Sequence, residues 1–376
     1  MSITTYTMQE FKPDMLEVLE RYRRFWNHES LDRPLAHVSI PLKCWKGLPS
    51  GWFGRLCGYP GGPKAWEKMV GYWISAFQER KTLRDDWLPM INPFFGPPAI
   101  AAFLTPQLCD LEFVPTNHEG TAWARPLLDT WEKLDELHLD FDNEWFRKCI
   151  TLTDYLVAKS RGRFAVGLTD THSTGDMMAA LRGTLRLIID IYQNPTEVKR
   201  LADICTKAFL EILDICFERI PHLAEGTVMQ PWPLWAPGEK SCTIQEDVVA
   251  YFSPALYREF LLPHDTQIAN HMDTTMFHVD GVHRIIPEIA KIRRLNAIQF
   301  TDTPKWFLIR DASEAEIENL RKTKKVLVIR CRNLEEAKRA VDLFGADGLL
   351  LFLEANSIEE GNKLLKELTV YNRDSR

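Results

Sequence analysis

The chain has 376 residues, with 46 Lys and Arg against 52 Asp and Glu, and its formal net charge is -6. This mild acidity argues against a protein that is held to nucleic acid by its overall electrostatic field. Hydrophobic residues make up 45% and charged residues 26% of the chain, which are ordinary values for a folded globular protein and argue against disorder or a coiled coil. A chain of this length can bury a core large enough for an enzyme.

The cysteine spacing and the lengths of the apolar runs indicate the cellular compartment of the protein. The eight cysteines include no Cys-x-x-Cys pair, so a structural zinc site built from paired cysteines is not expected. The N-terminal residues lack the apolar core of a signal peptide, and no stretch approaches the roughly 18 apolar residues of a membrane helix. We therefore expect a reduced, cytoplasmic protein that binds neither membrane nor nucleic acid.

Short apolar runs along the chain predict buried strands that alternate with helices. The last four predicted strands recur at intervals of roughly 20 to 30 residues, each followed by a helical pattern, which is typical of right-handed βα units in a parallel sheet. No Gly-x-Gly-x-x-Gly follows a predicted strand, so the nucleotide fingerprint of a doubly wound sheet is missing. The fold class predicted is α/β, a single (β/α)8 TIM barrel domain over residues 1–376. Its strands are expected at 34–41, 164–170, 226–232, 274–280, 296–302, 326–331 and 348–354, with one more around 105–130.

Several helices have recognisable starts and ends. Ser313 with Glu316 forms a capping box, and Asn333 with Glu336 forms a similar helix start. Gly345 can end the helix that begins after Asn333. Helical patterns are expected at 177–193, from Ser253-Pro254 onward, at 284–294, after Ser313, at 335–344 and at 359–368.

Residues 42–160 are rich in Trp, Pro and Gly and show little periodicity. We expect them to form loops and helices that decorate one end of the barrel. They either pack there as a structural connection or provide an aromatic wall for a hydrophobic ligand. The sequence leaves both open.

Polar residues follow the apolar body of several predicted strands, at the end where TIM barrels place their active sites. This pattern predicts a polar pocket for a small-molecule substrate, and the residues at the strand ends are Asp170, His172, Gln230, Trp232, His278, Asp280, Gln299, Asp302, Arg330, Glu354 and Asn356. Gln245 and Asp247, which lie just before Ser253-Pro254, are further candidates for the pocket.

His278 and Asp280 are the most informative pair, because alternate residues of a strand project to the same face. Nitrogen and oxygen ligands of this kind suit a divalent metal such as zinc, and Glu354 could supply a third ligand. Alternatively, Asp280 orients a catalytic His278, or both bind a polar substrate. A buried His–Asp pair that only stabilises the barrel is the remaining possibility.

The other candidates have competing interpretations. Asp170 and His172 either form a second catalytic wall of the pocket or belong to a helix cap. Gln245 and Asp247 either face the substrate or cap the helix that follows. Asp86 could bind substrate, although a solvated loop is the default expectation for it.

The segment Asp247–Pro263, D-V-V-A-Y-F-S-P-A-L-Y-R-E-F-L-L-P, followed by F-H-V-D-G at 277–281, resembles the uroporphyrinogen decarboxylase superfamily. That superfamily also contains the cobamide-dependent methyltransferases. N-A-I-Q-F at 296–300 and E-E-G-N-K-L-L at 359–365 are similar too, so the resemblance covers most of residues 160–370. It implies a (β/α)8 barrel and a homodimer.

The chain departs from this family at two places. No arginine-rich motif of R-Q-A-G-R type is present, and the corresponding region reads S-I-P-L-K-C-W. The methyltransferase branch typically binds zinc through a His-x-Cys pair and a further cysteine near the last strand. His278 of this chain resembles the histidine of that pair, but Asp280 stands where the family has the first cysteine. Glu354 lies near the position of the second cysteine. Such a carboxylate-rich site favours harder oxygen ligands over thiols.

These features together favour a methyltransferase that moves a methyl group between a small oxygen-containing compound and a corrinoid carried by a separate partner protein. Zinc is the metal that the resemblance implies. One alternative is a metal-free decarboxylase or lyase, in which Asp280 or Asp86 stabilises a cation and His278 moves a proton. Another is a non-catalytic barrel that binds a ligand.

Overall fold

The computed structural model describes residues 5–48, 62–93, 101, 103–104, 111–114, 121–124, 126–169, 171–229, 231–280, 283–301 and 307–374. Its α-helices are α1 (Thr5–Met8), α2 (Met15–Trp26), α4 (Pro63–Arg80), α5 (Glu144–Ser160), α6 (Thr174–Arg182), α7 (Thr184–Gln193), α8 (Pro195–Phe217), α9 (Pro254–Phe260), α10 (Leu262–His271), α11 (Ile286–Ile289), α12 (Leu308–Asp311), α13 (Glu314–Thr323), α14 (Leu334–Phe344) and α15 (Ile358–Asp374). Short 3-10 helices are η1 (Lys43–Trp45), η3 (Trp131–Glu136), η4 (Asp247–Tyr251) and η5 (His283–Ile285).

The strands are β1 (Leu35–Ser39), β2 (Met90–Ile91), β3 (Leu111–Val114), β4 (Thr121–Ala124), β5 (Ala165–Val166), β6 (Gly226–Met229), β7 (Leu234–Pro237), β8 (Ser241–Gln245), β9 (Thr274–Asp280), β10 (Ala297–Thr301), β11 (Val326–Arg330) and β12 (Leu349–Glu354). Six of them form a parallel sheet in the order β1-β12-β11-β10-β9-β8. β2 and β5 pair in parallel as a separate ladder, while β3 pairs with β4 and β6 with β7 in antiparallel hairpins. The fold is therefore mixed α/β with a parallel sheet.

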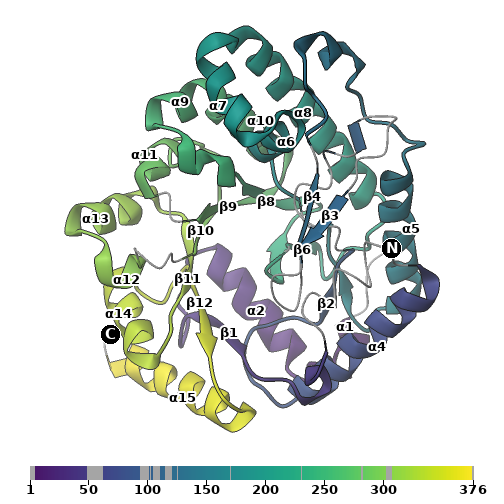
Figure 1. Ribbon diagram of the computed structural model, residues 1–376. Coiled ribbons are helices and arrows are strands. Elements are labelled where there is room, and N and C mark those ends of the chain that lie inside the picture. The colour runs from purple at the N-terminus through teal and green to yellow at the C-terminus, as the bar shows by residue number, and fades with distance from the viewer. Residues whose placement is uncertain are drawn as a thin grey trace.

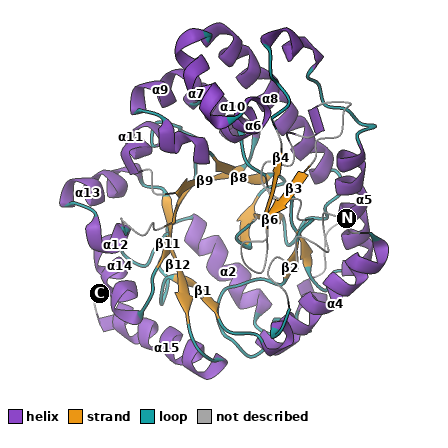
Figure 2. Ribbon diagram, in the orientation of Figure 1, coloured by secondary structure: helices purple, strands orange, loops and turns teal. Residues whose placement is uncertain are grey.

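The sheet curves around α2, and helices α9, α11, α13, α14 and α15 lie on its outer side (Figure 1). Colouring by secondary structure shows the same arrangement as an inner layer of strands and an outer layer of helices (Figure 2). Side chains alternate along each strand, so the two faces of the sheet feed two different cores. One core joins the strands to the outer helices, and the other packs Tyr22 and Phe25 of α2 against Leu35, Val328 and Leu350.

The local signals for helix ends act as expected. Ser313 and Glu316 form a complete capping box at α13, and the Asn333 side chain accepts from the backbone N–H of Glu336 at α14. Gly345 follows α14 with φ of 77°, a conformation that costs glycine little. These caps fix where each helix leaves the sheet.

Two of the strands predicted for the barrel pair instead in antiparallel hairpins. Residues 226–232 contribute β6, which folds into a hairpin with β7, because Pro231 and Pro233 cannot donate to a continuing ladder. The neighbour of β9 in the parallel sheet is instead β8, whose Ser-Cys-Thr-Ile-Gln sequence has no continuous apolar run. The strand expected around 105–130 is the β3–β4 hairpin, and the partner of β5 is the two-residue β2.

Two predicted helices also differ. The pattern at 177–193 spans two helices, α6 and α7, that meet at Gly183 with φ of 85°. The pattern at 284–294 gives only η5 and the four-residue α11, with Pro287 in its first turn. Residues 42–160 contain two long helices, α4 and α5, besides their loops. Within the part of the chain that the structure describes, no helix is long and apolar enough to cross a membrane.

Candidate functional site

Polar side chains gather at the carboxyl ends of the parallel strands, as the sequence predicted. Gln245 lies in register with His278, His278 with Gln299, and Asp280 with Thr301. Because in-register neighbours of parallel strands point to the same face, these side chains share one edge of the sheet. Asp170, Gln230 and Asp302 lie outside the described residues.

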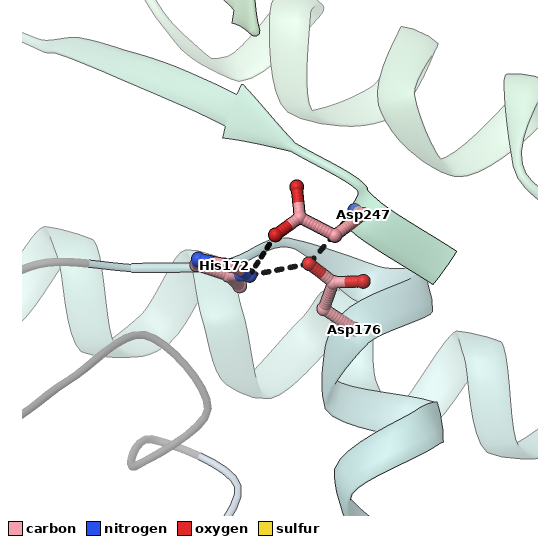
Figure 3. A group of neighbouring side chains, drawn as sticks. All are labelled: His172, Asp176 and Asp247. Carbon is pink, nitrogen blue, oxygen red and sulfur yellow. Dashed lines mark hydrogen bonds and ion pairs between the residues drawn. The ribbon is translucent and has the colours of Figure 1, made fainter. Parts of the chain in front are cut away.

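His172, Asp176 and Asp247 form the tightest polar cluster at this edge (Figure 3). His172 follows β5, Asp176 lies in the first turn of α6, and Asp247 opens η4 after β8. The Asp176 carboxylate contacts His172 Nδ1 and accepts from the backbone N–H groups of Asp247 (2.9 Å) and Val248 (2.7 Å). Three donors therefore fix Asp176, and Asp176 in turn orients the His172 ring.

The cluster has a buried and an open side. His172 is 5% exposed and Asp176 7%, whereas the Asp247 side chain is 43% exposed. Asp247 Oδ2 lies 3.9 Å from His172 Nδ1. Burial raises the pKa of Asp247 to about 6, with repulsion from Asp176 and Asp280 adding to it and His172 opposing it. Asp247 is thus a carboxyl group that can hold or release a proton near neutral pH.

A second, fully enclosed pair of carboxyl groups supports the cluster from behind. Glu246 Oε2 accepts from the backbone N–H of Asp176 at 3.2 Å, and Glu246 shares a hydrogen bond with Asp265. The Tyr257 hydroxyl donates to Asp265 Oδ2 at 2.6 Å. Burial raises the pKa of Asp265 to about 7 and that of Glu246 well above its ordinary range, so at least one of the two carries a proton.

His278 lies between the cluster and a cavity. Its Nδ1 contacts Oε1 of Gln299, whose own amide donates to the Phe300 carbonyl at 2.7 Å. The Trp232 ring lies 4.9 Å from the His278 ring, centroid to centroid. Burial lowers the pKa of His278 to about 4, so this imidazole is neutral at ordinary pH and oriented by Gln299.

The cavity beside His278 has a volume of about 550 Å³ and is bounded by the ends of β1, β10, β11 and β12, by α4 and by residues 231–233. Five aromatic side chains line it: Trp45, Trp73, Trp87, Trp232 and Phe352. Gln299 and Glu354 also line it, so together with Trp232 three of the predicted site residues lie around this space. The aromatic wall expected from residues 42–160 is therefore present, contributed by Trp45, Trp73 and Trp87.

The three residues predicted to hold zinc do not come together. Glu354 is ion-paired with Arg330 of the neighbouring strand, and two strands separate Glu354 from His278 and Asp280. His278 Nδ1 is already bound to Gln299. Among the described residues, the one group of three possible ligands whose donor atoms lie within 4.8 Å of one another is His172, Asp176 and Asp247. Its nitrogen and oxygen donors suit zinc or a harder cation.

The solvated position expected for Asp86 is wrong. Asp86 is 0% exposed, and its carboxylate accepts from Arg21 Nε at 2.9 Å, Arg33 Nη1 at 2.6 Å and the Ala36 backbone N–H at 2.8 Å. The two arginines hold the pKa of Asp86 far below its ordinary value although burial opposes them. This carboxylate thus ties the entry of β2 to β1, and all its strong contacts are with the protein itself.

Sequence reasoning missed Asp176, Glu246 and Asp265 as members of the site. One signal was available for Asp176, because it lies only four residues after His172, in the first turn of α6, so the two side chains are close in sequence. For Glu246 and Asp265 no local signal exists, since one follows β8 and the other lies in α10. Their contact depends on how α10 packs.

The sequence matches no protein-family model and no curated protein. Among solved structures, a methyltransferase from Methanosarcina mazei superposes with a TM-score of 0.63. The superposition covers 95% of this chain and 98% of that chain, at 11% sequence identity. At this identity the likeness establishes a shared fold along nearly the whole chain.

Proposed function

We propose that the chain is a (β/α)8-barrel enzyme that transfers a methyl group from a small, neutral, oxygen-containing methyl compound to a corrinoid carried by a partner protein. The barrel would consist of β1, β2, β5 and β8 to β12. Two hydrogen bonds support closure on either side of β2 and β5: Asp86 N–H to the Ala36 carbonyl at 2.7 Å, and Ser173 N–H to the Gln245 carbonyl at 2.9 Å. The structural likeness to a methyltransferase is consistent with this assignment.

The observation that carries the proposal is the charge balance of the cavity. Its two arginines both have acidic partners, Arg80 with Asp85 at 2.7 Å and Arg330 with Glu354. Among the described residues that line the cavity, none offers an uncompensated positive charge to a carboxylate. A carboxylated substrate would lose its hydration without a paired cation, which is costly. This favours methyl transfer from a neutral compound over decarboxylation.

The proposed reaction breaks the carbon–oxygen bond of the methyl compound. The methyl carbon forms a bond to the corrinoid, which supplies the electron pair, and the departing oxygen keeps the electrons of the broken bond and takes up one proton. We assign the supply of that proton to His172, which contacts Asp176, and to the neighbouring Asp247. Trp232 and His278 connect this cluster to the cavity.

Residues 170–175, Asp-Thr-His-Ser-Thr-Gly, have the Asp-x-His-x-x-Gly spacing of corrinoid-binding domains. Here, however, His172 is buried and its Nδ1 contacts Asp176, so we assign it to acid–base chemistry and the corrinoid to a partner. If zinc binds, His172, Asp176 and Asp247 are the donors that fit it. It would then polarise the departing oxygen as a Lewis acid.

The test is methyl transfer to free cob(I)alamin, which stands in for the corrinoid partner. Purified protein is incubated with methanol or 2-methoxyphenol, and loss of the cob(I)alamin absorbance is compared with demethylated product measured by mass spectrometry. General acid–base catalysis contributes about 100-fold or more, so His172→Ala should lower the rate by at least that factor. The exposed histidine variant His138→Ala is the matched control and should retain the wild-type rate.

Full activity in His172→Ala would contradict the assigned proton donor. Release of CO2 from a carboxylated compound, with no methyl transfer from either donor, would instead support the lyase alternative.

A further inference from the structure

The first turn of α6 and the start of η4 hold each other by hydrogen bonds that run in both directions. Asp176 of α6 accepts from the backbone N–H groups of Asp247 and Val248 at 2.9 and 2.7 Å. In return, Oε2 of Glu246, the residue directly before η4, accepts from the backbone N–H of Asp176 at 3.2 Å. Each segment thus supplies a carboxyl group to N–H groups at the start of the other, where a helix leaves them without a partner of its own.

Two more hydrogen bonds extend this contact toward β8. The backbone N–H of Ser173 donates to the Gln245 carbonyl at 2.9 Å, and the backbone N–H of Gln245 donates to Ser173 Oγ at 3.1 Å. Five hydrogen bonds therefore join residues 173–176 to residues 245–248, although the paired residues are 70 to 72 positions apart in sequence. His172 directly precedes the first of these segments and Asp247 lies in the second, so this junction sets where the two side chains stand relative to each other.

Glu246 also connects the junction to the helices behind it. It is 4% exposed and shares a hydrogen bond with Asp265 of α10, to which the Tyr257 hydroxyl of α9 donates at 2.6 Å. Burial raises the pKa of Glu246 well above its ordinary value, so Glu246 carries the proton of this hydrogen bond. Glu246 therefore accepts from α6 on one side and donates to α10 on the other.

A glycine makes the close approach of α6 to Glu246 possible. A Cβ at Gly175 would lie 2.4 Å from Glu246 Oε2 and 2.8 Å from Val248 Cγ1, which are shorter distances than a Cβ can tolerate. Any side chain at this position would push the first turn of α6 away from η4. The absence of a side chain at Gly175 and the length of the Glu246 side chain thus fit each other.

We propose that Glu246 is a positioning residue, which holds the first turn of α6 against η4 and so fixes how Asp176 orients His172. Glu246 acts through hydrogen bonds alone, and it neither touches the substrate nor exchanges a proton in the reaction. The kinetic consequence rests on the proposed function, whereas the orientation of His172 can be measured without it. Misplacing a catalytic group by about 1 Å can cost about 100-fold in rate, so losing this contact should affect turnover more than substrate binding.

The experiment compares Glu246→Gln with Glu246→Met in the cob(I)alamin assay, after circular dichroism has confirmed folding. Glutamine keeps an acceptor for the Asp176 N–H and a donor for Asp265, whereas methionine has a similar volume but no donor and only a weak acceptor. We expect Glu246→Gln to retain kcat within about threefold, and Glu246→Met to lower kcat by about tenfold or more with KM changed less than about twofold. Glu259→Met, at an exposed ion pair with Lys199, is the matched control and should keep wild-type kinetics.

A spectroscopic readout tests the positioning itself. Long-range proton–nitrogen NMR spectra of histidine-labelled protein, assigned with His172→Ala, report whether Nδ1 of His172 carries a proton toward Asp176. We expect the wild-type signal in Glu246→Gln, and in Glu246→Met a signal displaced toward that of an unprotonated Nδ1. Gly175→Ala moves α6 while leaving Glu246 in place and should resemble Glu246→Met in both readouts, which keeps the test decisive if the methionine variant does not fold.

Wild-type kcat and an unchanged His172 signal in folded Glu246→Met would overturn the inference. A Glu246→Gln variant that loses as much activity as Glu246→Met would also overturn it, because the carboxyl proton rather than the hydrogen bonds would then be required. If the wild type transfers no methyl group, the proposed reaction fails, whereas the His172 signals of the variants still decide the positioning role.

Discussion

Replacing Asp86 by Asn tests whether the first two strands are held together by a buried charge network. The Asp86 carboxylate accepts three hydrogen bonds at 2.6 to 2.9 Å, two of them from arginines, and is 0% exposed. Asparagine has nearly the same shape, but it keeps one acceptor oxygen and turns an N–H₂ toward arginine donors. Arg33, itself 6% exposed, would then be a buried charge without its carboxylate partner, bonded only to neutral groups such as the Pro34 carbonyl.

Hydrogen bonds to charged groups contribute about 1.5 to 3 kcal/mol each, and breaking one side of a buried ion pair costs about 3 to 5 kcal/mol. Since asparagine retains part of the network, we expect Asp86→Asn to lower the free energy of unfolding by about 3 to 5 kcal/mol. That is a large part of the roughly 5 to 15 kcal/mol that folded proteins possess. Urea unfolding followed by circular dichroism measures the difference.

The pH dependence gives a second check on the same network. Because the folded state lowers the pKa of Asp86, its contribution is present above the unfolded value of about 3.9 and is lost as pH falls further toward the folded value. The gap between wild type and Asp86→Asn should stay constant from pH 7 to pH 5 and narrow below about pH 4. Asp135→Asn, at an exposed ion pair with Arg200, should change stability by no more than about 0.5 kcal/mol. A loss below about 1 kcal/mol in Asp86→Asn would refute the reasoning.

Three further outcomes follow from the site. A Cβ at Gly175 would lie 2.4 Å from Glu246 Oε2, so Gly175→Ala should lower the free energy of unfolding in urea by about 1 to 3 kcal/mol. Gly71→Ala in α4 is the control, because a Cβ there has no atom within 4 Å. It should leave stability unchanged or raise it by up to about 1 kcal/mol. Because the folded state raises the pKa of Asp265 to about 7, wild-type stability should fall as pH rises from about 4 to 7, at up to about 1.4 kcal/mol per pH unit. The Asp265→Asn variant should lack this slope. An unchanged slope in that variant would exclude Asp265 as its origin. Zinc titrated by calorimetry should bind His172→Ala at least tenfold more weakly than the wild type and Glu354→Gln equally well; the opposite pattern would place the metal on β12.

The sequence by itself determined the regular part of the fold and the strand ends at which several of the polar residues lie. Buried apolar runs with capped helices between them were enough for β1 and β9 to β12, because continuous apolar runs and helix caps are local signals. The change from apolar to polar residues at the strand ends placed His278 and Gln299 together, and the two lie in register on β9 and β10.

Only the tertiary structure decided which polar residues meet. β8 has no apolar run and β2 has two residues, so their places beside β9 and β5 depend on pairing with strands remote in sequence. The predicted zinc set combined His278 and Asp280 of one strand with Glu354 at the end of the last strand. In the sheet, β10 and β11 separate β9 from β12, and Arg330 pairs with Glu354.

The cluster of His172, Asp176 and Asp247 instead joins the start of α6 to the end of β8. Asp86 was expected in solvent because the sequence around it shows no partner for its charge. Its partners, Arg21 and Arg33, lie more than 50 residues before it and reach it only in the folded chain. Long-range contacts set burial and charge pairing, and these decide whether a carboxylate binds a ligand, carries a proton or fixes two strands together.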